Sequence, residues 1–432
     1  MRAVVLAAGG GVRLQPLTLT KPKCLLPIGG RALLEWIFRA LREAGIKEVL
    51  TILSPEGRKV KEVYGSGSRL GLKVSYAWDR HPKGTGASLT LAKPSTKDRI
   101  FLTVYGDIYL SAGTIKGFLK EGLKRLREGS QAVLAVVRVE KPQEYGVVQV
   151  KGKGRVLKLL EKPERPRSNL ANAGIYLFTP EIFRAIRYVK PSPRGEIELT
   201  EAINLLAGKG EVHTVKLSSG GWLDVGRPWD LLEANRRALL EAEGEVEGVV
   251  EPQVILRGKI TIEKGVVIRF GSVIDGPAFI GSGSEVGPFA RIRPYTSIGR
   301  NVRIGSFCEV KNSIVMDGSK IPHLCYVGDS IIGENCNFGA GTLIANLRLD
   351  EQPVKVEVKG LKVSSGLRKF GAILGDEVKT AVNVSIMPGV KVGPRSLLGP
   401  NLSISTDIPA DTLVTGRQRL FFKRLKGRVE AC

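Results

Sequence analysis

The sequence has few cysteines and few histidines, and this limits the metal and redox chemistry that it can carry. The five cysteines, Cys24, Cys308, Cys325, Cys336 and Cys432, form no Cys-x-x-Cys pair, and only three histidines accompany them. Zinc sites and disulfide frameworks need such residues at short, regular spacing. The pattern therefore indicates neither a zinc site nor a disulfide scaffold.

Long apolar runs are missing as well. No run reaches the ~18 residues that a membrane-spanning helix requires. The short apolar stretch at residues 3–8 is ended by Gly9 and Arg13, so it has the form of a buried first strand rather than a signal peptide. We therefore expect a cytoplasmic protein with no membrane partner.

Acidic residues are outnumbered by basic ones. The chain has 66 Lys and Arg against 42 Asp and Glu, a formal net charge of +24. Nucleic acid would be attracted by this excess, but so would small polyanions such as nucleotides and coenzyme A. Because the basic residues are dispersed, except in the tail at 417–428, we expect small anionic substrates and no nucleic-acid partner.

Strand-like and helix-like segments alternate up to about residue 233. Residues 3–8, 48–53 and 99–104 have the composition of buried strands, and residues 32–44 carry apolar side chains at helical spacing up to Gly45. Such alternation predicts an α/β, Rossmann-like domain with a mostly parallel sheet. Ligands of these sheets bind beyond the carboxyl ends of the strands.

The apolar pattern then changes to a period of six. Aliphatic residues recur at this spacing without a break from Val250 to Val310, and glycine often follows them directly. The period is disturbed at 311–325 and later resumes. Neither a helix nor a sandwich strand has this period, which is typical of the hexapeptide repeats of a parallel β-helix.

These patterns divide the chain into four parts. We place the α/β domain at 1–233 and a linker helix at 234–248, which overlaps the amphipathic segment 229–244. We expect a left-handed parallel β-helix at 249–410 and a basic tail at 411–432. The two large parts predict two separate functional units.

A glycine-rich turn follows the first strand candidate. Glycines in such a place let backbone N–H groups close on a phosphate. The turn fits neither GxxxxGK[ST] nor GxGxxG. The whole string LAAGGGVRLQPLT, followed by KPKCLLP, resembles the signature of the sugar-1-phosphate nucleotidyltransferase family.

This resemblance implies roles for residues throughout the first domain. Arg13 and Lys23 would be catalytic residues on the phosphates, and Asp107 and Asp224 would hold Mg²⁺. The nucleotide would lie against Leu6, Ala7, Ala8, Gly9, Gly10, Gly11, Gly84 and Thr85. The sugar phosphate would lie against Tyr105, Gly146, Glu161, Lys162 and Asn172.

The implied reaction is the attack of a sugar 1-phosphate oxygen on the α-phosphorus of a nucleoside triphosphate, with pyrophosphate leaving. Two anions must meet, so positioning and charge neutralisation carry the catalysis. The sequence departs from the family at two places. Val12 replaces a common threonine, and Asp79 stands where a glutamine usually reads the pyrimidine. Both UTP and dTTP therefore remain open as substrates.

A histidine lies where the period of six is disturbed. The string KIPHLCYVGD at 320–329, with NFGAGT at 337–342, resembles the acetyltransferase half of the bifunctional glucosamine-1-phosphate acetyltransferase and N-acetylglucosamine-1-phosphate uridylyltransferase family. Histidine can accept a proton from an amine near neutral pH. The resemblance therefore implies that His323 is the general base of acetyl transfer.

The same resemblance implies further ligand contacts and an assembly. The sugar phosphate would be held by Arg293, Lys311, Tyr326, Asn337 and Lys355. Acetyl-CoA, the co-substrate, would contact Ala340, Asn346 and Thr380. Members of this family with such a β-helix imply a homotrimer.

Three functions stay open at this point. The first is a bifunctional enzyme that acetylates glucosamine 1-phosphate and couples a sugar 1-phosphate to UTP or dTTP. The second is a monofunctional nucleotidyltransferase, acting on glucose 1-phosphate, whose β-helix only assembles trimers. The third is a non-catalytic regulatory subunit of the same layout, which the presence of Arg13, Lys23, Asp107 and Asp224 disfavours.

Overall fold

A nine-stranded mixed sheet forms the centre of the head in the computed structural model, which describes residues 1–96, 99–193 and 195–423. The strand order is β5-β4-β1-β6-β11-β8-β12-β10-β9. The strands are β1 (Arg2–Ala7), β4 (Glu48–Leu53), β5 (Lys73–Trp78), β6 (Phe101–Tyr105), β8 (Ala132–Arg138), β9 (Gly146–Lys151), β10 (Arg155–Glu161), β11 (Leu170–Phe178) and β12 (Val212–Lys216).

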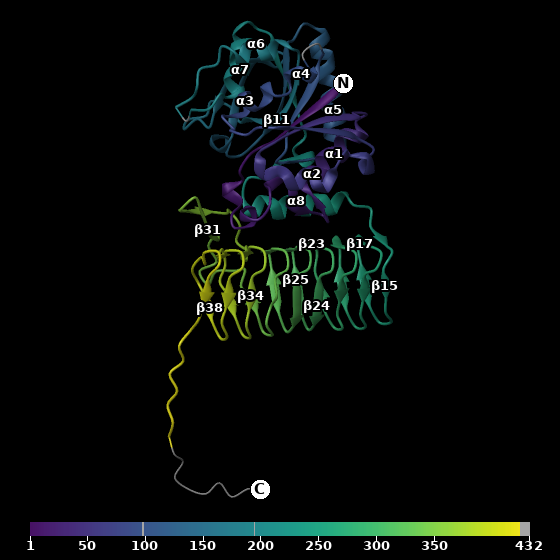
Figure 1. The fold of residues 1–432 in the computed structure, drawn as a ribbon, viewed down its shortest axis with the longest axis vertical. Coiled ribbons are helices and arrows are strands. Elements are labelled where there is room, and N and C mark those ends of the chain that lie inside the picture. The colour runs from purple at the N-terminus through teal and green to yellow at the C-terminus, as the bar shows by residue number, and fades with distance from the viewer. Residues whose placement is uncertain (97–98, 194, 424–432) are drawn as a thin grey trace, which may run out of the picture.

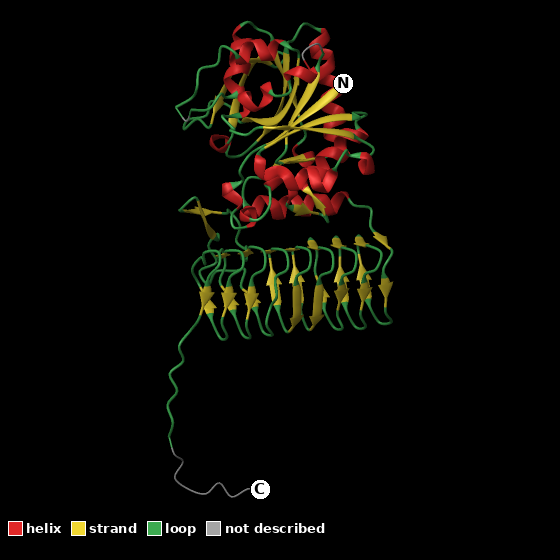
Figure 2. Cartoon of the chain, viewed as in Figure 1, coloured by secondary structure: helices red, strands yellow, loops and turns green. Residues whose placement is uncertain are grey.

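Helices cover both faces of this sheet (Figure 2). They are α1 (Leu33–Glu43), α2 (Arg58–Tyr64), α3 (Thr85–Thr90), α4 (Lys93–Thr96), α5 (Ala112–Arg127), α6 (Glu181–Ile186) and α7 (Leu199–Gly208). Two short antiparallel pairs join β2 (Pro27–Ile28) to β3 (Arg31–Ala32) and β7 (Ile108–Leu110) to β13 (Trp222–Asp224). Two buried clusters result, with α1 and α5 contributing to one and α6 and α7 to the other.

The head confirms the predicted alternation of strands and helices, with one difference in strand direction. The segments expected at 3–8, 48–53 and 99–104 are β1, β4 and β6, and β1 pairs in parallel with both β4 and β6. The helix expected at 32–44 is α1. However, β11 runs antiparallel to both β6 and β8, and β10 runs antiparallel to both β12 and β9. The sheet is therefore mixed rather than mostly parallel.

The second half is a left-handed β-helix whose three faces are parallel sheets (Figure 1). One face consists of β14 (Glu245–Val246), β17 (Ile260–Ile262), β20 (Ala278–Ile280), β23 (Thr296–Ile298), β26 (Ile314–Val315), β29 (Ile331–Ile332), β33 (Ile373–Leu374) and β36 (Lys391–Val392). The second consists of two sheets that Asn337 bridges. The first contains β15 (Val249–Val250), β18 (Val267–Ile268), β21 (Glu285–Val286), β24 (Arg303–Ser306) and β27 (Lys320–His323), and the other contains β34 (Lys379–Thr380), β37 (Leu397–Leu398) and β39 (Leu413–Val414). The third consists of β16 (Ile255–Arg257), β19 (Val273–Asp275), β22 (Arg291–Ile292), β25 (Glu309–Lys311), β28 (Tyr326–Gly328), β30 (Leu343–Ile344), β35 (Ser385–Ile386) and β38 (Ser403–Ile404).

The aliphatic residues at a spacing of six fill the interior of this β-helix, as the repeat predicted. Ile262, Ile280 and Ile298 stack on successive coils and are fully buried. The disturbance near 311–325 is one missing residue, because Ile298 pairs with Val315 rather than with the residue one place later. The coil is shortened at a corner, so the inward positions stay aliphatic.

A second departure from the repeat is an excursion of the chain. Ile332 of β29 pairs with Leu374 of β33, so the residues between Ile344 and Leu374 include a segment outside the coil. This segment forms a hairpin of β31 (Lys355–Val358) and β32 (Leu361–Ser364). In Figure 1 the hairpin projects from the β-helix toward the head.

The helix α8 (Pro228–Glu241) lies between the head and the β-helix (Figures 1 and 2). Expected at 229–244, it ends earlier. Its Asn235 accepts hydrogen bonds from Gly29 N (2.8 Å) in the head and Ser297 Oγ (2.6 Å) in the β-helix, and donates to Tyr295 O (2.9 Å). Thus α8 is a packed layer between the two halves rather than a free linker.

A buried apolar cluster, here called the shared cluster, crosses this boundary. Its members come from the head, α8, the hairpin and the β-helix. They include Leu14, Leu17, Tyr109, Trp229, Leu231, Ile314, Met316, Val354, Val356, Val358 and Phe370. Burial of this surface fixes the head against the β-helix.

No helix in the described ranges is both long and apolar enough to cross a membrane. Within the tail expected at 411–432, β39 adds a rung to the β-helix, and residues 424–432 lie outside the described part.

Candidate active sites

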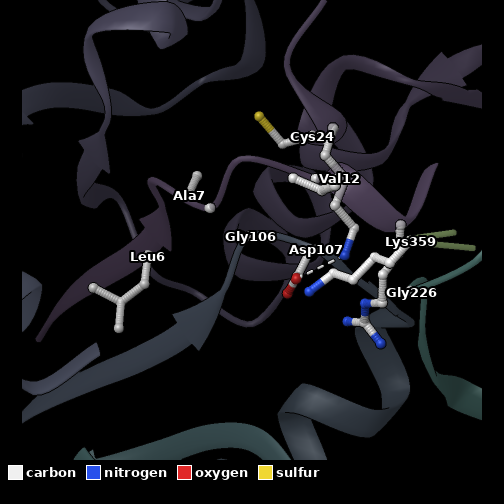
Figure 3. Close-up of a pocket in the computed structure, with 12 residues that line it drawn as sticks. Leu6, Ala7, Val12, Cys24, Gly106, Asp107, Gly226 and Lys359 are labelled. Atoms are coloured by element: carbon white, nitrogen blue, oxygen red, sulfur yellow. Dashed lines mark hydrogen bonds and ion pairs between the residues drawn. The ribbon is translucent and has the colours of Figure 1, made fainter. Parts of the chain in front are cut away.

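The head contains a cavity of about 290 Å³ at the carboxyl ends of β1 and β6. Figure 3 shows its lining. The lining residues are Leu6, Ala7, Gly9, Gly11, Val12, Arg13, Lys23, Cys24, Gly106, Asp107, Gly226 and Lys359. The glycine turn and both predicted catalytic residues of the head therefore meet in one cavity.

Glycines keep side chains away from part of this cavity. Gly11 has φ +64, and a Cβ there would lie 3.0 Å from Thr18 Cγ2. A Cβ on Gly106 would lie 2.6 Å from Ala7 Cβ, so β1 and β6 approach too closely for any side chain. Gly9 and Gly10 have open space above them. This arrangement leaves N–H groups free to approach a phosphate.

Acidic and basic side chains are paired at the mouth of the cavity. Lys23 Nζ lies 2.8 Å from Asp107 Oδ2. Burial, and then repulsion by Asp107, raise the pKa of Asp224, while Lys23, Arg13 and Lys162 act in the opposite direction. The two carboxylates expected to hold a metal therefore lie within electrostatic reach of each other.

This pair of carboxylates fits a divalent cation. No group of three or more His, Cys, Asp or Glu capable of holding a metal occurs among the described residues. Mg²⁺ is commonly bound by only one or two carboxylates, with substrate phosphates and water completing the shell. A cation would also relieve the repulsion between Asp107 and Asp224.

The residues expected to bind the sugar phosphate in the head lie on neighbouring strands. Asn172 Nδ2 donates to Tyr176 Oη (2.6 Å), which donates to Tyr105 Oη (3.1 Å). Burial raises the pKa of Tyr105 to about 12, so it stays a neutral hydrogen-bonding group. Gly146 pairs with Glu161, and a Cβ on Gly146 would lie 3.2 Å from Glu161 Oε2.

The loop with Gly84 and Thr85 packs against a segment more than a hundred residues later. Gly86 N donates to Ile197 O (2.9 Å), and Leu199 N donates to Thr85 Oγ1 (3.2 Å). Gly84 has φ +101, and a Cβ there would lie 2.6 Å from Ile197 O. Glycine is therefore required where these two segments touch.

Asp79, which replaces the glutamine usual in the family, is held inside the head. Ser88 Oγ donates to Asp79 Oδ2 (2.5 Å), and Asp79 is 9% exposed. Its carboxylate already has a partner within the fold.

A second cluster of polar side chains lies on the third face of the β-helix, around Asp329. Lys311 Nζ lies 3.1 Å from Asp329 Oδ2, and Asn346 Nδ2 donates to the same oxygen (2.5 Å). Asn346 Nδ2 also lies 3.3 Å from Tyr326 Oη. The structure thus brings together Lys311, Tyr326 and Asn346, which the sequence predicted as ligand contacts.

Arg293 borders this cluster. Its guanidinium forms a 2.8 Å ion pair with Glu309, and Glu309, Tyr326 and Asp329 together help to raise its pKa. Burial, with repulsion from Asp329 and Glu309, raises the pKa of Tyr326. The cluster therefore holds cations and carboxylates in near balance beside an un-ionised phenol.

His323 ends β27 on the adjacent face and is exposed. Its carbonyl oxygen accepts a hydrogen bond from Gly341 N (3.3 Å), which places the turn with Ala340 against it on the next coil. Asn337 is exposed and bridges Lys320 and Lys379 on the same face. His323, Asn337 and Ala340 therefore share one edge of the β-helix.

Two predicted contacts lie apart from these groups. Thr380 is 5% exposed at an inward position, where its hydroxyl lies 2.7 Å from Thr342 Oγ1 and accepts from Gly339 N (3.0 Å). Lys355 is exposed on β31 of the hairpin, whose neighbouring valines join the shared cluster. No contact connects either residue with Asp329 among the described residues.

Sequence reasoning missed two residues of these sites. Asp329 connects the predicted contacts of the β-helix, and a signal for it existed because the aspartate directly follows the YVG string. Lys359 lines the cavity of the head although it belongs to the hairpin. Nothing local in the sequence marks Lys359, because its neighbours in the cavity are more than 130 residues distant in the chain.

Comparisons with known families match both halves. The nucleotidyl transferase family matches residues 2–241. A family described as the GMPPB C-terminal domain matches residues 274–387.

Similar proteins extend over the whole chain. "Bifunctional protein GlmU" of Methanocaldococcus jannaschii is 42% identical over 99% of this chain and 100% of its own length. "Bifunctional sugar-1-phosphate nucleotidylyltransferase/acetyltransferase" of Sulfurisphaera tokodaii is 42% identical over 94% of this chain and 98% of its own. A crystal structure from Bacillus anthracis, a provisionally assigned glucose-1-phosphate thymidylyltransferase with bound sucrose, covers 55% of this chain and 95% of its own, with 28% identity and a TM-score of 0.51.

Proposed function

Because the chain belongs to the family of bifunctional sugar-1-phosphate nucleotidyltransferases and acetyltransferases, we propose a specific reaction for each of its two sites. The head transfers a nucleotidyl group from UTP or dTTP to a sugar 1-phosphate and releases pyrophosphate. The β-helix transfers the acetyl group of acetyl-CoA to the amine of glucosamine 1-phosphate. The observation that carries the first reaction is the meeting of Arg13, Lys23 and Asp107 beside the glycine turn.

In the head, the protein's main contribution is to bring two anions together. The turn at 9–11 would receive the triphosphate on backbone N–H groups, while Arg13 and Lys23 neutralise its charge. The neutral hydroxyl of Tyr105, with Asn172 and Glu161, would orient the sugar. The sugar phosphate oxygen then attacks the α-phosphorus, and the bond to pyrophosphate breaks.

Asp107 and Asp224 would hold Mg²⁺ in this site. When bound, the ion supplies positive charge that stabilises the phosphate oxygens. Burial, and then repulsion by Asp107, raise the pKa of Asp224, and the closeness of the two carboxylates supports this assignment.

In the β-helix, His323 would remove a proton from the amine of glucosamine 1-phosphate. The amine nitrogen then forms a bond to the thioester carbonyl carbon, and the carbon–sulfur bond breaks to release coenzyme A, whose sulfur takes up a proton. Arg293 and Lys311 would bind the sugar phosphate, with Tyr326 and Asn346 beside it. The network around Asp329 supports a binding site here, because a purely structural coil does not need a buried carboxylate with three donors.

The protein is proposed to be a homotrimer. An apolar ladder, defined as Phe270, Phe289, Phe307 and Leu324, runs along one corner of the β-helix and is 39% to 63% exposed. Phe289 stacks on Phe307 at 5.7 Å between ring centroids. Leu324 directly follows His323, so a neighbouring subunit on this ladder would border the acetyl-transfer site.

One experiment tests the two reactions together. Glucose, glucosamine and N-acetylglucosamine 1-phosphates are combined with UTP and dTTP, and pyrophosphate release is measured. Thiol release from acetyl-CoA is measured in parallel with glucosamine 1-phosphate. Absence of thiol release with active nucleotidyl transfer would support the monofunctional alternative instead.

A further inference from the structure

The hairpin of β31 and β32 is anchored at the polar cluster around Asp329. The chain leaves the β-helix after Asn346, and the hairpin's base is closed by a bridge between Leu347 and Lys369. Phe370 N then donates to Asn346 O (2.9 Å) where the chain re-enters the coil. The base of the excursion is therefore fixed beside a side chain that contacts Asp329.

The body of the hairpin is fixed against the head. Val354, Val356 and Val358 are buried in the shared cluster, together with Leu14 and Leu17 of the head. Leu14 lies one residue from Arg13. The apolar face of the hairpin is thus held beside the loop that carries the predicted phosphate ligands.

The tip of the hairpin is a tight two-residue turn. Val358 pairs with Leu361, and the two residues between them, Lys359 and Gly360, have φ +54 and +77. A turn with positive φ at both central positions is the type that suits the twist of a β-hairpin. The position of Lys359 is therefore set by backbone geometry.

Lys359 reaches the cavity of the head from this turn. It lines the cavity together with Arg13, Lys23 and Asp107, and Figure 3 shows it with Asp107 and the backbone at Gly226. Lys23 is paired with Asp107 at 2.8 Å, and no ion pair of Lys359 is found within the described ranges. Lys359 is thus an exposed cation aimed into a site for a polyanion.

We propose that Lys359, a residue of the β-helix half, binds the phosphates that leave as pyrophosphate in the reaction of the head. This inference rests on the proposed nucleotidyl transfer. In Figure 3, Leu6 and Ala7 lie on one side of the cavity and Lys359 and Gly226 on the other. The nucleoside would lie toward Leu6 and Ala7 on β1, and the triphosphate tail would extend toward Lys359. A third cation there offsets the carboxylate of Asp107 and adds to the field that attracts the phosphates.

The test is the substitution Lys359→Asn. Asparagine followed by glycine is strongly preferred in turns of this type, so the change removes the charge and keeps the hairpin. We expect the KM for the nucleoside triphosphate, and the KM for inorganic pyrophosphate in the reverse reaction, to rise roughly tenfold. Lys359→Arg should restore most of the affinity. Acetyl transfer and the unfolding temperature should remain as in the unaltered protein.

Lys362→Asn is the matched control, because Lys362 is an exposed lysine of the same hairpin that does not line the cavity. It should change neither KM. An unchanged KM for both triphosphate and pyrophosphate in Lys359→Asn would overturn the inference while leaving the proposed nucleotidyl transfer intact. If the unaltered protein transfers no nucleotidyl group to any sugar 1-phosphate, the proposed function fails and the inference falls with it.

Discussion

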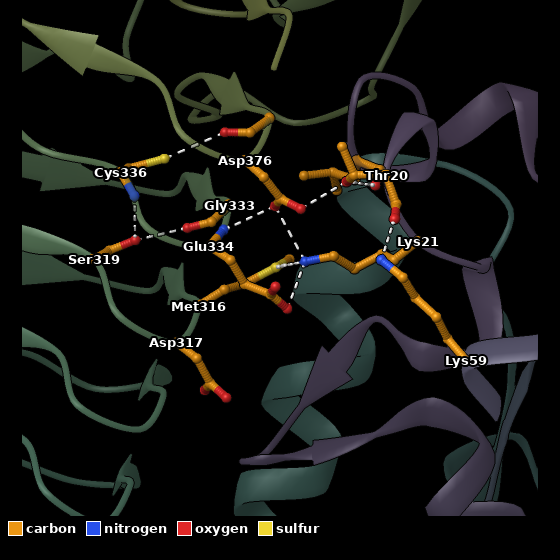
Figure 4. Close-up of polar contacts among 12 residues, drawn as sticks. Thr20, Lys21, Lys59, Met316, Asp317, Ser319, Gly333, Glu334, Cys336 and Asp376 are labelled. Carbon is orange, nitrogen blue, oxygen red and sulfur yellow. Dashed lines mark hydrogen bonds and ion pairs between the residues drawn. The ribbon is translucent and has the colours of Figure 1, made fainter. Parts of the chain in front are cut away.

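Lys21 Nζ of the head lies 3.1 Å from Asp376 Oδ1 of the β-helix, and their side chains are only 6% and 8% exposed. Asp376 also accepts hydrogen bonds from Thr20 Oγ1 (2.6 Å) and Glu334 N (2.8 Å), as Figure 4 shows. A buried ion pair costs desolvation, but it fixes the relative position of the groups that it joins.

Asp376→Ala should destabilise the protein by roughly 3 kcal/mol, because among the described residues it leaves the buried ammonium of Lys21 with Glu334 as its one remaining carboxylate partner. Calorimetry should show the first unfolding transition at a lower temperature. The double variant Lys21→Met/Asp376→Leu removes both charges and should recover part of the loss. Equal destabilisation in the single and double variants would contradict the explanation that the buried charge of Lys21 causes the loss of stability.

Asp107→Asn should lower nucleotidyl transfer by roughly a hundredfold or more, since the metal would lose one of two carboxylates. Acetyl transfer should stay unchanged, because the β-helix cluster shares no residue with the cavity. Pyrophosphate release and thiol release measure the two reactions. Asp411→Asn, which alters an exposed ion pair with Arg395, is the control and should leave both reactions as they are.

His323→Ala should reduce acetyl transfer by on the order of 10² to 10⁴, the range expected for loss of a general base, and spare nucleotidyl transfer. His213→Ala is its control, because His213 contacts Ser130 in the head, away from both sites. Thiol release is followed across pH. Normal acetylation by His323→Ala would show that another group takes the proton.

Ile304→Ala should cost about 2 to 5 kcal/mol in the free energy of unfolding, because the residue is fully buried between coils and its loss leaves a cavity. Denaturant unfolding measures the change. Leu413→Ala, at a side chain that is 65% exposed, should cost well under half as much. Similar costs at the two positions would contradict the stacked core.

Asp230→Asn should change how stability depends on pH. Burial, followed by repulsion from Asp224, raises the pKa of Asp230 to about 7, against the hydrogen bonds that it accepts from Gly226 N and Arg227 N. The pKa of Asp230 is higher in the folded than in the unfolded protein. Its contribution to stability is therefore greatest below about pH 4 and is lost as pH rises to 7.

Asparagine keeps one oxygen, and a single oxygen of Asp230 accepts both backbone bonds. As pH rises from 4 to 8, the free energy of unfolding of the variant should therefore increase by roughly 1 to 2 kcal/mol relative to that of the unaltered protein. Urea unfolding at several pH values measures this. A difference in stability that does not vary with pH would contradict the shifted pKa.

The sequence predicts the β-helix well because each inward position must be aliphatic, so the period of six appears directly in the chain. Strand direction in the head is harder to predict from the sequence. The antiparallel placement of β11 between β6 and β8 depends on contacts among segments about 70 and 35 residues apart, and local apolar patterns do not record it.

The candidate sites divide in the same way. Arg13, Lys23 and the glycine turn lie close together in the chain, so a motif is enough to predict their meeting. Asp329 acts through a left-handed turn with φ +51 that buries its carboxylate among three donors, and Lys359 acts through the long-range packing of a hairpin. These contacts form only when the chain folds, so local sequence patterns do not record them.

The shared cluster affects whether the head and the β-helix can be separated. Leucines of the head pack against valines of the hairpin. Cutting the chain after α8 would therefore expose an apolar surface prone to aggregation on each fragment. We therefore expect point substitutions, but not cleavage of the chain, to separate the two activities. Neither half can therefore be expressed alone without new polar residues on the surface that the shared cluster now buries.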